Sequence, residues 1–364
     1  MGVKRMLLST CVAGAALALG ARGQSAPSST SAAAPKTTEQ VYKNIQALKG
    51  APADQLLPTM EFITASLGVQ CDFCHVERAF EKDDKENKQT ARKMMRMMFA
   101  INKDNFDGHL EVTCYACHRG AHKPVITPVI SEEEKAHSEE PNTASLPSAD
   151  QILAKYLQAV GGAAAASGIS ARKQTGTMTV GPDHFPVEVL AKAPAKRVTT
   201  VRFPDGDSVT GLNGEEGWLS TPGRAIKDTS PSEMDAARLE AELFFPGSLK
   251  QMFHQLSVQS KEKVNGHQAY VVLGIRDNRP PVQLYFDEES GLLVRLLRYT
   301  ETPVGRNPTQ VDYADYREDG GVKTPFRWTV ARPSGRFTIQ IEQMQQNTPI
   351  EDERFAKPSG APNG

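Results

Sequence analysis

Two copies of one short pattern carry the chemistry that this sequence can perform. Residues 71–75 read Cys-Asp-Phe-Cys-His, and residues 114–118 read Cys-Tyr-Ala-Cys-His. In a Cys-x-x-Cys-His pattern the two thiols attach a c-type haem covalently, and the adjacent histidine is the proximal ligand of the iron. The cysteines concerned are Cys71, Cys74, Cys114 and Cys117, and the histidines are His75 and His118. The two copies predict two covalently attached haem c groups.

Disulfides and zinc are the other uses that these cysteines could have. Export from the cytoplasm favours disulfides, and two Cys-x-x-Cys pairs can form a four-cysteine zinc site. Neither use explains why a histidine directly follows both pairs. The stretch 75–113 between the pairs is also longer than common zinc spacings. Haem attachment is therefore the favoured interpretation.

The N-terminal residues 1–23 have the pattern of a secretory signal peptide. Lys4 and Arg5 precede an apolar run at 6–19, and small residues before position 24 offer a cleavage site. The run is short for a membrane span, which needs about 20 apolar residues. We expect an exported, periplasmic protein, with membrane anchoring by an uncleaved signal as the alternative. Export agrees with the motifs, because c-type haem is attached outside the cytoplasm.

The length of 364 residues favours two domains. A net charge of −1 with mixed signs throughout gives no case for a nucleic-acid partner. Composition divides the chain into a signal peptide (1–23), a low-complexity tether (24–39), a diheme domain (40–123), a linker rich in Pro and Glu (124–147), a β-rich domain (148–358) and a flexible tail (359–364).

Strand patterns dominate the second domain after one helix at 148–160. Strands are predicted at 174–180, 186–191, 197–203, 269–275, 282–286, 292–299, 327–330 and 337–343. Turn signals separate them at intervals of roughly 10 residues, which is typical of an antiparallel meander that curls into an open barrel or strongly bent sheet. Helices are predicted at 232–244 and 249–256. The expected fold class is a small all-α diheme domain followed by an antiparallel open β-barrel with a few helices.

Methionines on two predicted helices are the candidates for the second axial ligands of the irons. Met60 lies on an apolar-periodic helix that Gly68 can end. Because the helix rises about 12 Å from Met60 to Gly68, a turn there can bring the first motif back alongside it. A second helix at 89–102 contains four methionines and has a stripe of residues 91, 94, 98 and 101 at helical spacing. The pattern alone does not choose among Met94, Met95, Met97 and Met98.

Residues 40–123 resemble the diheme module of the photosynthetic reaction-centre cytochrome c subunit family. The strings that carry the resemblance are 44–49, Thr59-Met60, the two Cys-x-x-Cys-His motifs, Ala91-Arg92-Lys93-Met94, Ala100-Ile101-Asn102 and the residues flanking the second motif at 112–120. In that family a methionine on the helix before most motifs is the sixth ligand. The resemblance therefore implies that Met60 pairs with His75 and that Met94 pairs with His118.

The resemblance covers about one repeat of that family. Purple-bacterial members carry four haems as two tandem diheme repeats, whereas no further Cys-x-x-Cys-His occurs here. A family histidine that ligates a haem of the missing repeat has its nearest counterpart in His109, one residue out of step. We therefore expect half of the family's haems and no ligand role for His109.

The β-rich part looks like the periplasmic lipoprotein-carrier and lipoprotein-sorting superfamily. The strings concerned are Tyr156-Leu157, 159–162, Lys192-Ala193-Pro194, Asn213-Gly214, Gly217-Trp218, Tyr313, Tyr316, Gly320 and Pro325-Phe326. That fold is an unclosed antiparallel barrel, and its members often hold an acyl chain on the concave apolar face. The resemblance leaves open whether this copy binds a lipid, a quinone or no ligand.

These features predict a periplasmic diheme c-type cytochrome that transfers single electrons and is not an enzyme. Its expected partner is a redox protein or a membrane complex. One alternative is a diheme peroxidase-like enzyme, in which a displaced methionine would open one iron to substrate. The other alternative is a protein that binds an apolar ligand in the β-rich domain and senses its redox state through the haems. The donor, the acceptor and the oligomeric state do not follow from the sequence.

Overall fold

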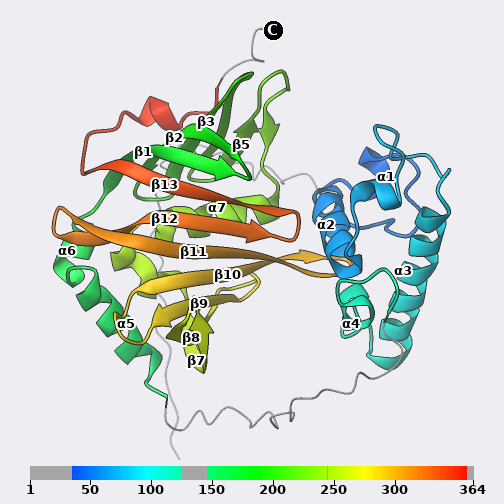
Figure 1. Cartoon of the computed structure of the whole chain (residues 1–364), viewed down its shortest axis with the longest axis horizontal. Coiled ribbons are helices and arrows are strands. Elements are labelled where there is room, and N and C mark those ends of the chain that lie inside the picture. Colours follow the sequence, from blue (N-terminus) through cyan, green and yellow to red (C-terminus); the bar gives the residue numbers. More distant parts are fainter. Residues whose placement is uncertain (1–34, 125–145, 244, 359–364) are drawn as a thin grey trace, which may run out of the picture. The chain divides into compact units, whose positions relative to one another are not determined.

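The structure is a computed structural model that describes residues 35–124, 146–243 and 245–358 (Figure 1). The predicted signal peptide, most of the tether, nearly all of the linker and the tail lie outside the described residues. Among the helices in the described ranges, none is both long and apolar enough to cross a membrane.

Short helices and one long helix make up the part of the chain that carries the two motifs. They are α1 (Thr38–Val41), η1 (Ala53–Gln55), α2 (Leu56–Leu67), η2 (Cys71–Phe73), α3 (Glu86–Asn105) and α4 (Cys114–His118), where η denotes a 3₁₀ helix. Helix α2 ends as predicted at Gly68, which adopts the left-handed conformation with φ 65° that glycine reaches without steric cost.

The β-rich part begins with two helices and then forms one large sheet. Its helices are α5 (Ala149–Ala159), α6 (Ala163–Ser167), α7 (Pro231–Leu243), η4 (Pro246–Met252) and η5 (Asp352–Phe355). Its strands are β1 (Ala171–Val180), β2 (Asp183–Lys192), β3 (Lys196–Phe203), β4 (Gly206–Asn213), β5 (Glu216–Ser220), β6 (Lys227–Asp228), β7 (Gln255–Val264), β8 (His267–Ile275), β9 (Val282–Asp287), β10 (Leu293–Thr302), β11 (Gly305–Asp319), β12 (Val322–Arg332) and β13 (Gly335–Gln346).

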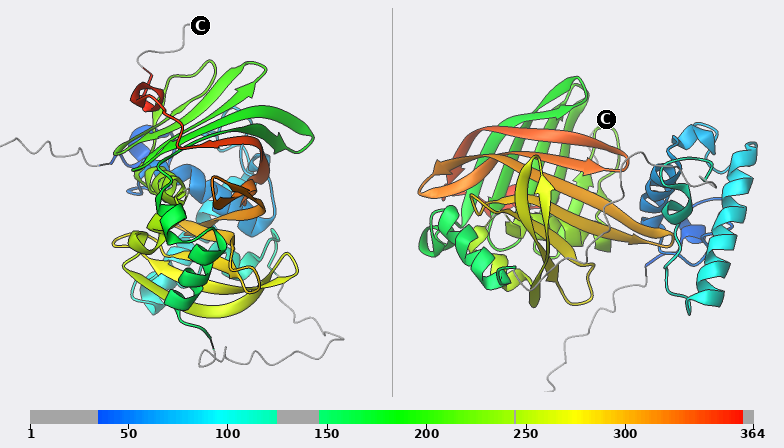
Figure 2. Two further views of the ribbon diagram at one scale, coloured as in Figure 1. Left: turned by 90° about the vertical axis from the view of Figure 1, so that its left-hand side faces the viewer. Right: turned by 60° about the horizontal axis from the view of Figure 1, so that its bottom comes forward.

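The sheet has thirteen strands in the order β6-β5-β4-β3-β2-β1-β13-β12-β11-β10-β9-β8-β7. It therefore consists of two antiparallel meanders that are joined where the first strand, β1, pairs with the last, β13. Strands β6 and β7 are its two edges, so the sheet is open in the described part of the chain. Figure 2 shows how strongly it bends. The predicted open antiparallel sheet with a few helices is confirmed.

Helices fill the inner side of this bend. Side chains of α5, α7 and η4, among them Tyr156, Leu239 and Leu249, belong to the same buried cluster as the inner faces of the strands. Helix α5 starts where the sequence predicts, because Ser148 and Gln151 cap it reciprocally. The second predicted helix, 249–256, is different: η4 ends at Met252, and the chain pairs with β8 from Gln255 onwards.

The hairpin between β10 and β11 contributes to the core of the motif-bearing part. Val304 at its tip is fully buried in one cluster with Leu56, Phe62 and Met98. A side chain on Gly305 would collide with the ring of Phe62, since a Cβ at this position would lie 2.4 Å from it. The hairpin thus completes the hydrophobic core around α2.

Candidate haem-attachment site

The first motif forms a tight turn that orients its histidine. The N–H of His75 donates to the carbonyl of Cys71 at 3.0 Å. The imidazole Nδ1 lies 3.0 Å from the carbonyl oxygen of Phe80, and the Phe80 ring stands edge-on to the imidazole with 5.5 Å between the centroids. Because a carbonyl can only accept, Nδ1 carries the proton and Nε2 keeps its lone pair for a metal.

Two buried cations, Lys88 and Arg92, and the exposed carboxylate of Asp83 hold the loop that carries Phe80. Lys88 Nζ donates to the Phe80 carbonyl at 2.8 Å and lies 3.1 Å from the Asp83 carboxylate. Arg92 donates to Asp83 at 2.9 Å and to the carbonyl of Asn44 at 3.0 Å. The hydrogen bond from Arg92 holds the pKa of the Asp83 carboxyl well below its ordinary value. This cluster fixes the loop and, through Phe80, the imidazole of the first motif.

The surroundings of His75 favour its neutral form. Burial lowers the pKa of the imidazole, and the nearby cations Lys88 and Arg92 lower it further, against the raising effect of the hydrogen bond to Phe80. The neutral imidazole is the form that binds a metal. The electrostatics and the hydrogen bond at Nδ1 therefore prepare the same ring nitrogen for an iron.

The thiols do not resemble those of a redox-active dithiol. Burial raises the pKa of Cys74 and raises that of Cys114 to about 11, whereas a reactive cysteine needs a lowered pKa. The four described cysteines are all free, with no disulfide between them. In the same residues, no group of three or more His, Cys, Asp or Glu side chains could hold a metal ion. In this part of the chain the cysteines are therefore not brought together as a four-cysteine zinc site requires.

Asn102 anchors the chain that leads into the second motif. This side chain is 3 % exposed and lies on α3. Its Oδ1 accepts from the N–H groups of Glu111 and Val112 at 3.0 and 2.8 Å. Its Nδ2 donates to the carbonyl of Val112 at 2.7 Å and to that of Met98 at 3.0 Å. One buried amide thus satisfies both backbone groups of Val112.

The second motif is a short helix with a cap at each end. The Thr113 hydroxyl accepts from the N–H of Ala116 at 3.3 Å, as an N-cap residue does. His118 Nδ1 lies 3.0 Å from the carbonyl oxygen of Ala121. This repeats the arrangement at His75, with Nδ1 held by a backbone carbonyl and Nε2 left for a metal.

The two motifs meet at the C-terminal end of α2. The N–H of Gly120 donates to the carbonyl of Ser66 at 2.8 Å. A Cβ on Gly68 would lie 2.1 Å from the carbonyl oxygen of Gly120. Only glycine therefore allows the turn before the first motif to approach the turn after the second.

Met60 lies on α2 within the hydrophobic core. Its side chain is half-buried and packs against the cluster that contains Leu56, Phe62 and Ile63. Helix α2 packs against α4, so Met60 is carried by the element around which both motifs are arranged.

The methionines of α3 divide into two kinds. Met95 and Met98 are 8 % and 4 % exposed, whereas Met94 and Met97 are 40 % and 49 % exposed. The Sδ of Met98 lies 4.0 Å from the Sγ of Cys114. Met94 is one helical turn before Met98 and shares its side of the helix, but it is the more exposed of the two.

Polar residues occupy the inner face of α3, unlike the apolar stripe expected at 91, 94, 98 and 101. The buried positions are Lys88, Arg92, Met95, Met98 and Asn102. The three polar members are buried because each binds backbone carbonyls, carboxylates or N–H groups of the neighbouring loops. Their roles were not predicted, although Arg92 and Asn102 occur in the strings that carry the family resemblance.

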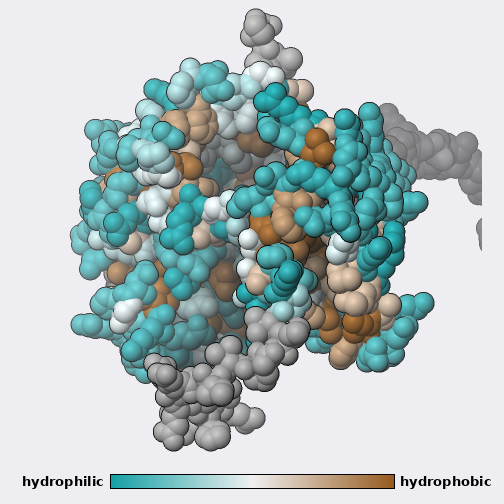
Figure 3. Space-filling view, turned by 45° about the vertical axis from the view of Figure 1, so that its right-hand side comes forward, coloured by the Kyte–Doolittle hydropathy of each residue, from teal (hydrophilic) through white to brown (hydrophobic). Residues whose placement is uncertain are grey.

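Several apolar side chains are exposed in the part of the chain that carries the motifs. Those more than a third exposed in the motif-bearing part are Val41, Leu57, Phe80, Met94, Met97, Phe106, Leu110 and Tyr115. Figure 3 shows apolar patches within a mainly hydrophilic surface. Exposed apolar surface of this kind is expected beside an apolar macrocycle or at an interface. Two thiol pairs, two oriented imidazoles and the thioethers of the half-buried Met60 and the exposed Met94 form a donor set that fits covalently attached haem.

Comparison with known proteins agrees with this donor set. Residues 10–158 match the model of the family described as photosynthetic reaction centre cytochrome C subunit. This part of the chain is similar to that family. A reaction-centre cytochrome c subunit from Thermochromatium tepidum is 36% identical over 91 residues, covering 24% of this chain and 22% of that protein. One from Roseobacter denitrificans is 35% identical over 107 residues, covering 25% and 29%. The predicted resemblance is confirmed, and the comparisons support a c-type cytochrome.

The similarity to these relatives is confined to part of their length. The chain spans less than a third of either curated relative. Cytochrome c-554 of Chloroflexus aurantiacus, 33% identical over 85 residues, is matched over 20% of its own length.

Solved structures match the β-rich part. A LolA superfamily protein from Nitrosomonas europaea has a TM-score of 0.41 and 15% identity, covering 58% of this chain and 99% of that one. A putative outer membrane lipoprotein-sorting protein domain from Vibrio parahaemolyticus has a TM-score of 0.40 and 13% identity, covering 57% and 94%. Both TM-scores and both sequence identities are low. The fold is therefore described from the strand order and register of this sheet itself.

Proposed function

We propose that the chain is an exported diheme c-type cytochrome that transfers single electrons and has no other catalytic activity. The observation that carries the proposal is the repeated arrangement in which a Cys-x-x-Cys-His histidine has its Nδ1 held by a backbone carbonyl. Haem c, when bound, supplies a one-electron iron couple. The protein then has to attach, orient and shield it.

Each side chain has a defined task in this proposal. Cys71 and Cys74 hold one porphyrin, and Cys114 and Cys117 hold the other. His75 and His118 supply the proximal nitrogens. Met60 supplies the sulfur for the haem of the first motif and Met94 that for the haem of the second. Binding of a thioether and an imidazole to one haem iron would raise its reduction potential, and with both ligands bound the iron would have no position open to a substrate.

The proposed division of the chain follows from the same reasoning. Residues 40–123 form the diheme domain and 148–358 the β-rich domain, with residues 1–23 as the export signal. The partner is a redox protein or a membrane complex outside the cytoplasm. The similarity to reaction-centre cytochrome subunits supports a membrane complex as one such partner, with half the haems of that family.

The axial methionines are tested by the near-infrared charge-transfer band of methionine-ligated ferric haem. The full-length protein is produced in a host competent in cytochrome c maturation. Met60→Ala and Met94→Ala should each remove about half of the band, because each leaves one iron without its sulfur. Met97→Ala is the matched control, since Met97 lies on the same helix and is 49 % exposed, against 40 % for Met94, and it should keep the full band.

Two results would contradict the proposal. If Met94→Ala kept the full band while Met98→Ala lost half of it, the assignment of the second axial ligand would be wrong. If the unmodified protein lacked the band and reduced peroxide rapidly, an enzyme with an open iron would replace the electron carrier.

A further inference from the structure

The hairpin formed by β10 and β11 contacts α2, the helix that carries Met60. Its loop, Pro303-Val304, lies between the paired residues Thr302 and Gly305. The Thr302 hydroxyl donates to the carbonyl of Gly305 at 2.5 Å and accepts from the N–H of Val304 at 3.3 Å. Both Thr302 and Val304 are buried. The tip of the β10–β11 hairpin therefore has one defined shape where it meets α2.

The hairpin holds α2 at the two residues that directly follow Met60. The Nδ2 of Asn307 donates to the Glu61 carboxylate at 2.9 Å. The backbone of Gly305 approaches the ring of Phe62 so closely that a Cβ would lie 2.4 Å from it. Because successive residues are about 100° apart around a helix, Glu61 and Phe62 lie about 100° and about 200° from Met60. Two contacts in different directions fix the rotation of α2 about its axis, and with it the direction of the Met60 side chain.

The C-terminal end of α2 is held by a different element. There the N–H of Gly120, which follows the second motif, donates to the carbonyl of Ser66 at 2.8 Å. Ser66 is about 9 Å along the helix axis from Met60, whereas Glu61 is only about 1.5 Å away along that axis. The contact with the hairpin is therefore the one that acts directly at Met60.

Asn307 is a buried polar side chain in a largely apolar contact. It is 6 % exposed, and within the described residues no donor reaches its Oδ1. Because a carboxylate without its proton can only accept, the NH₂ group of Asn307 has to face Glu61. A hydrogen bond to a charged group is stronger than one between neutral groups. The best-established role of such a buried polar pair is to select one register between packed elements.

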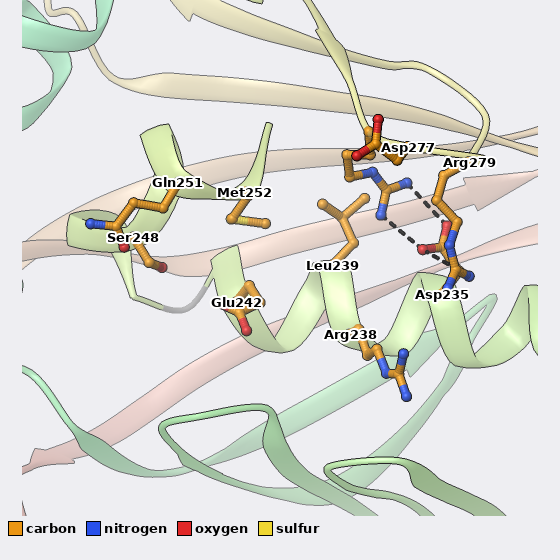
Figure 4. Close-up of a pocket in the computed structure, with 10 residues that line it drawn as sticks. Asp235, Arg238, Leu239, Glu242, Ser248, Gln251, Met252, Asp277 and Arg279 are labelled. Carbon is orange, nitrogen blue, oxygen red and sulfur yellow. Dashed lines mark hydrogen bonds and ion pairs between the residues drawn. The ribbon is translucent and has the colours of Figure 1, made fainter. Parts of the chain in front are cut away.

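A charged cluster elsewhere in the β-rich part joins elements of that part alone. Figure 4 shows Asp235 between two arginine side chains. Arg276 binds Asp235 through two nitrogens at 2.9 and 3.0 Å, and Arg279 lies 3.4 Å away. These residues line a cavity of about 380 Å³ and hold α7 to the segment after β8. The pair of Asn307 and Glu61 is different, because its members come from β11 and from the helix before the first motif.

We propose that the β10–β11 hairpin positions the sulfur of Met60 for the iron of the first motif, with Asn307 as a positioning residue. The proposal rests on the axial role given to Met60 under the proposed function. The hydrogen bond from Asn307 acts on α2, whereas Met94 lies on α3. Loss of this bond should therefore affect the haem of the first motif and leave that of the second unchanged.

The test is displacement of the axial sulfur by imidazole in the full-length haem-loaded protein, followed by the near-infrared methionine-iron band. Imidazole is neutral like the thioether, so a charge added nearby does not by itself favour either ligand. Asn307→Asp places a carboxylate opposite that of Glu61 and replaces the hydrogen bond by repulsion. The half of the band that Met60→Ala removes should then disappear at an imidazole concentration at least about tenfold lower, the usual weight of a hydrogen bond to a charged group. The other half should disappear at an unchanged concentration.

A rescue variant and two controls separate positioning from a general loss of stability. Asn307→Asp combined with Glu61→Gln rebuilds the bond in the opposite direction, because the new amide can donate to the new carboxylate. This double variant should titrate like the unmodified protein. Asn278→Asp adds the same charge at an exposed position after β8, and Val272→Ala removes a fully buried side chain from the core of the β-rich part. Neither control should shift the titration.

The outcomes distinguish this proposal from the axial assignment itself. If Met60→Ala removed half of the band but Asn307→Asp titrated like the unmodified protein, or shifted both halves alike, only the positioning role would be overturned. A double variant as sensitive as Asn307→Asp would overturn it too. If Met60→Ala kept the full band, the axial assignment would be wrong, and the positioning role with it.

Glu61→Gln alone decides the question if Asn307→Asp yields no haem-loaded protein. This variant keeps an acceptor for Asn307 but removes its charge, so the bond should weaken without being lost. The half of the band that belongs to Met60 should then shift in the same direction by about threefold. An unshifted titration would overturn the proposal.

Discussion

Replacing Asn102 by alanine should destabilise the haem-bearing part and loosen the second motif. The side chain is nearly buried and makes two hydrogen bonds to the backbone of Val112. Both bonds are partly shielded from water. Its bond to Glu111 is replaceable by water, because Glu111 is exposed. Two unreplaced hydrogen bonds at about 1–1.5 kcal/mol each give a loss of about 2–3 kcal/mol.

The assay is urea unfolding of the haem-loaded protein followed by the Soret band. With a slope of about 2 kcal/mol per molar urea, the midpoint should fall by about 1 M. Asn105→Ala is the matched control on the same helix. Asn105 is exposed and makes one bond, to the carbonyl of Ile101 at 3.1 Å, so its loss should cost no more than about 0.5 kcal/mol.

The same Asn102→Ala variant should also show a changed spectrum. Val112 leads directly into Thr113 and Cys114, so its release should broaden or weaken the methionine-iron band of one haem and leave the other unchanged. Equal unfolding midpoints for Asn102→Ala and Asn105→Ala would refute the anchoring role of the amide.

Three further substitutions test single features of the structure. Gly68→Ala should lower the Soret unfolding midpoint more than Gly50→Ala, because both positions have positive φ but only at Gly68 would the Cβ meet a backbone oxygen; equal losses would contradict the close approach. The Asp83 carboxyl has a folded pKa below its unfolded value of about 4, so its contribution is present above that pH and is lost as the pH falls. Asp83→Asn should accordingly lose less stability than the unmodified protein between about pH 6 and about pH 3, and parallel pH profiles would refute this. Val304→Ala should cost about 2 kcal/mol, since the side chain is fully buried, whereas Val180→Ala, at an exposed position, should cost less than about 0.5 kcal/mol.

Local patterns predicted much of the sheet, but not β4 to β7 and not its longest strand, β11. The strands with alternating apolar residues, such as β2, β3 and β8, were anticipated within a few residues at each end. Strand β11 was not, because its inward positions include Asn307 and Thr309, which are polar yet 6 % and 5 % exposed. Where both the inward and the outward residues of a strand are polar, the sequence lacks the alternation of apolar and polar residues by which a strand is recognised.

Long-range pairings were beyond the reach of sequence patterns. The pairing of β1 with β13 joins the two meanders into one open sheet. Nothing in the sequence of either strand identifies the other as its partner. The hairpin that places Val304 in the core around α2 is a similar case. Such contacts join residues that are far apart in the chain, whereas periodicity and turn signals report only on neighbours.

The residues proposed to bind haem could be named from the sequence. The residues that hold the surrounding loops in place could not. The spacing of the cysteines and histidines named the residues that would bind haem, because attachment needs those types at that separation. The charged stretch 77–88 is typical of a solvated loop, yet Lys88 is 8 % exposed and holds the Phe80 carbonyl. The sequence does not distinguish a lysine that binds backbone oxygens from a lysine in water. The role of Lys88 could therefore be found only from the structure.

The mass of the exported, full-length protein under denaturing conditions tests the central claim most directly. After production in a host that matures c-type cytochromes, the polypeptide should be heavier than its apo form by two haem groups. Cys114→Ala combined with Cys117→Ala should reduce this increase to one haem. A polypeptide that carries no haem, or that releases all of its haem on denaturation, would contradict covalent attachment through the four thiols.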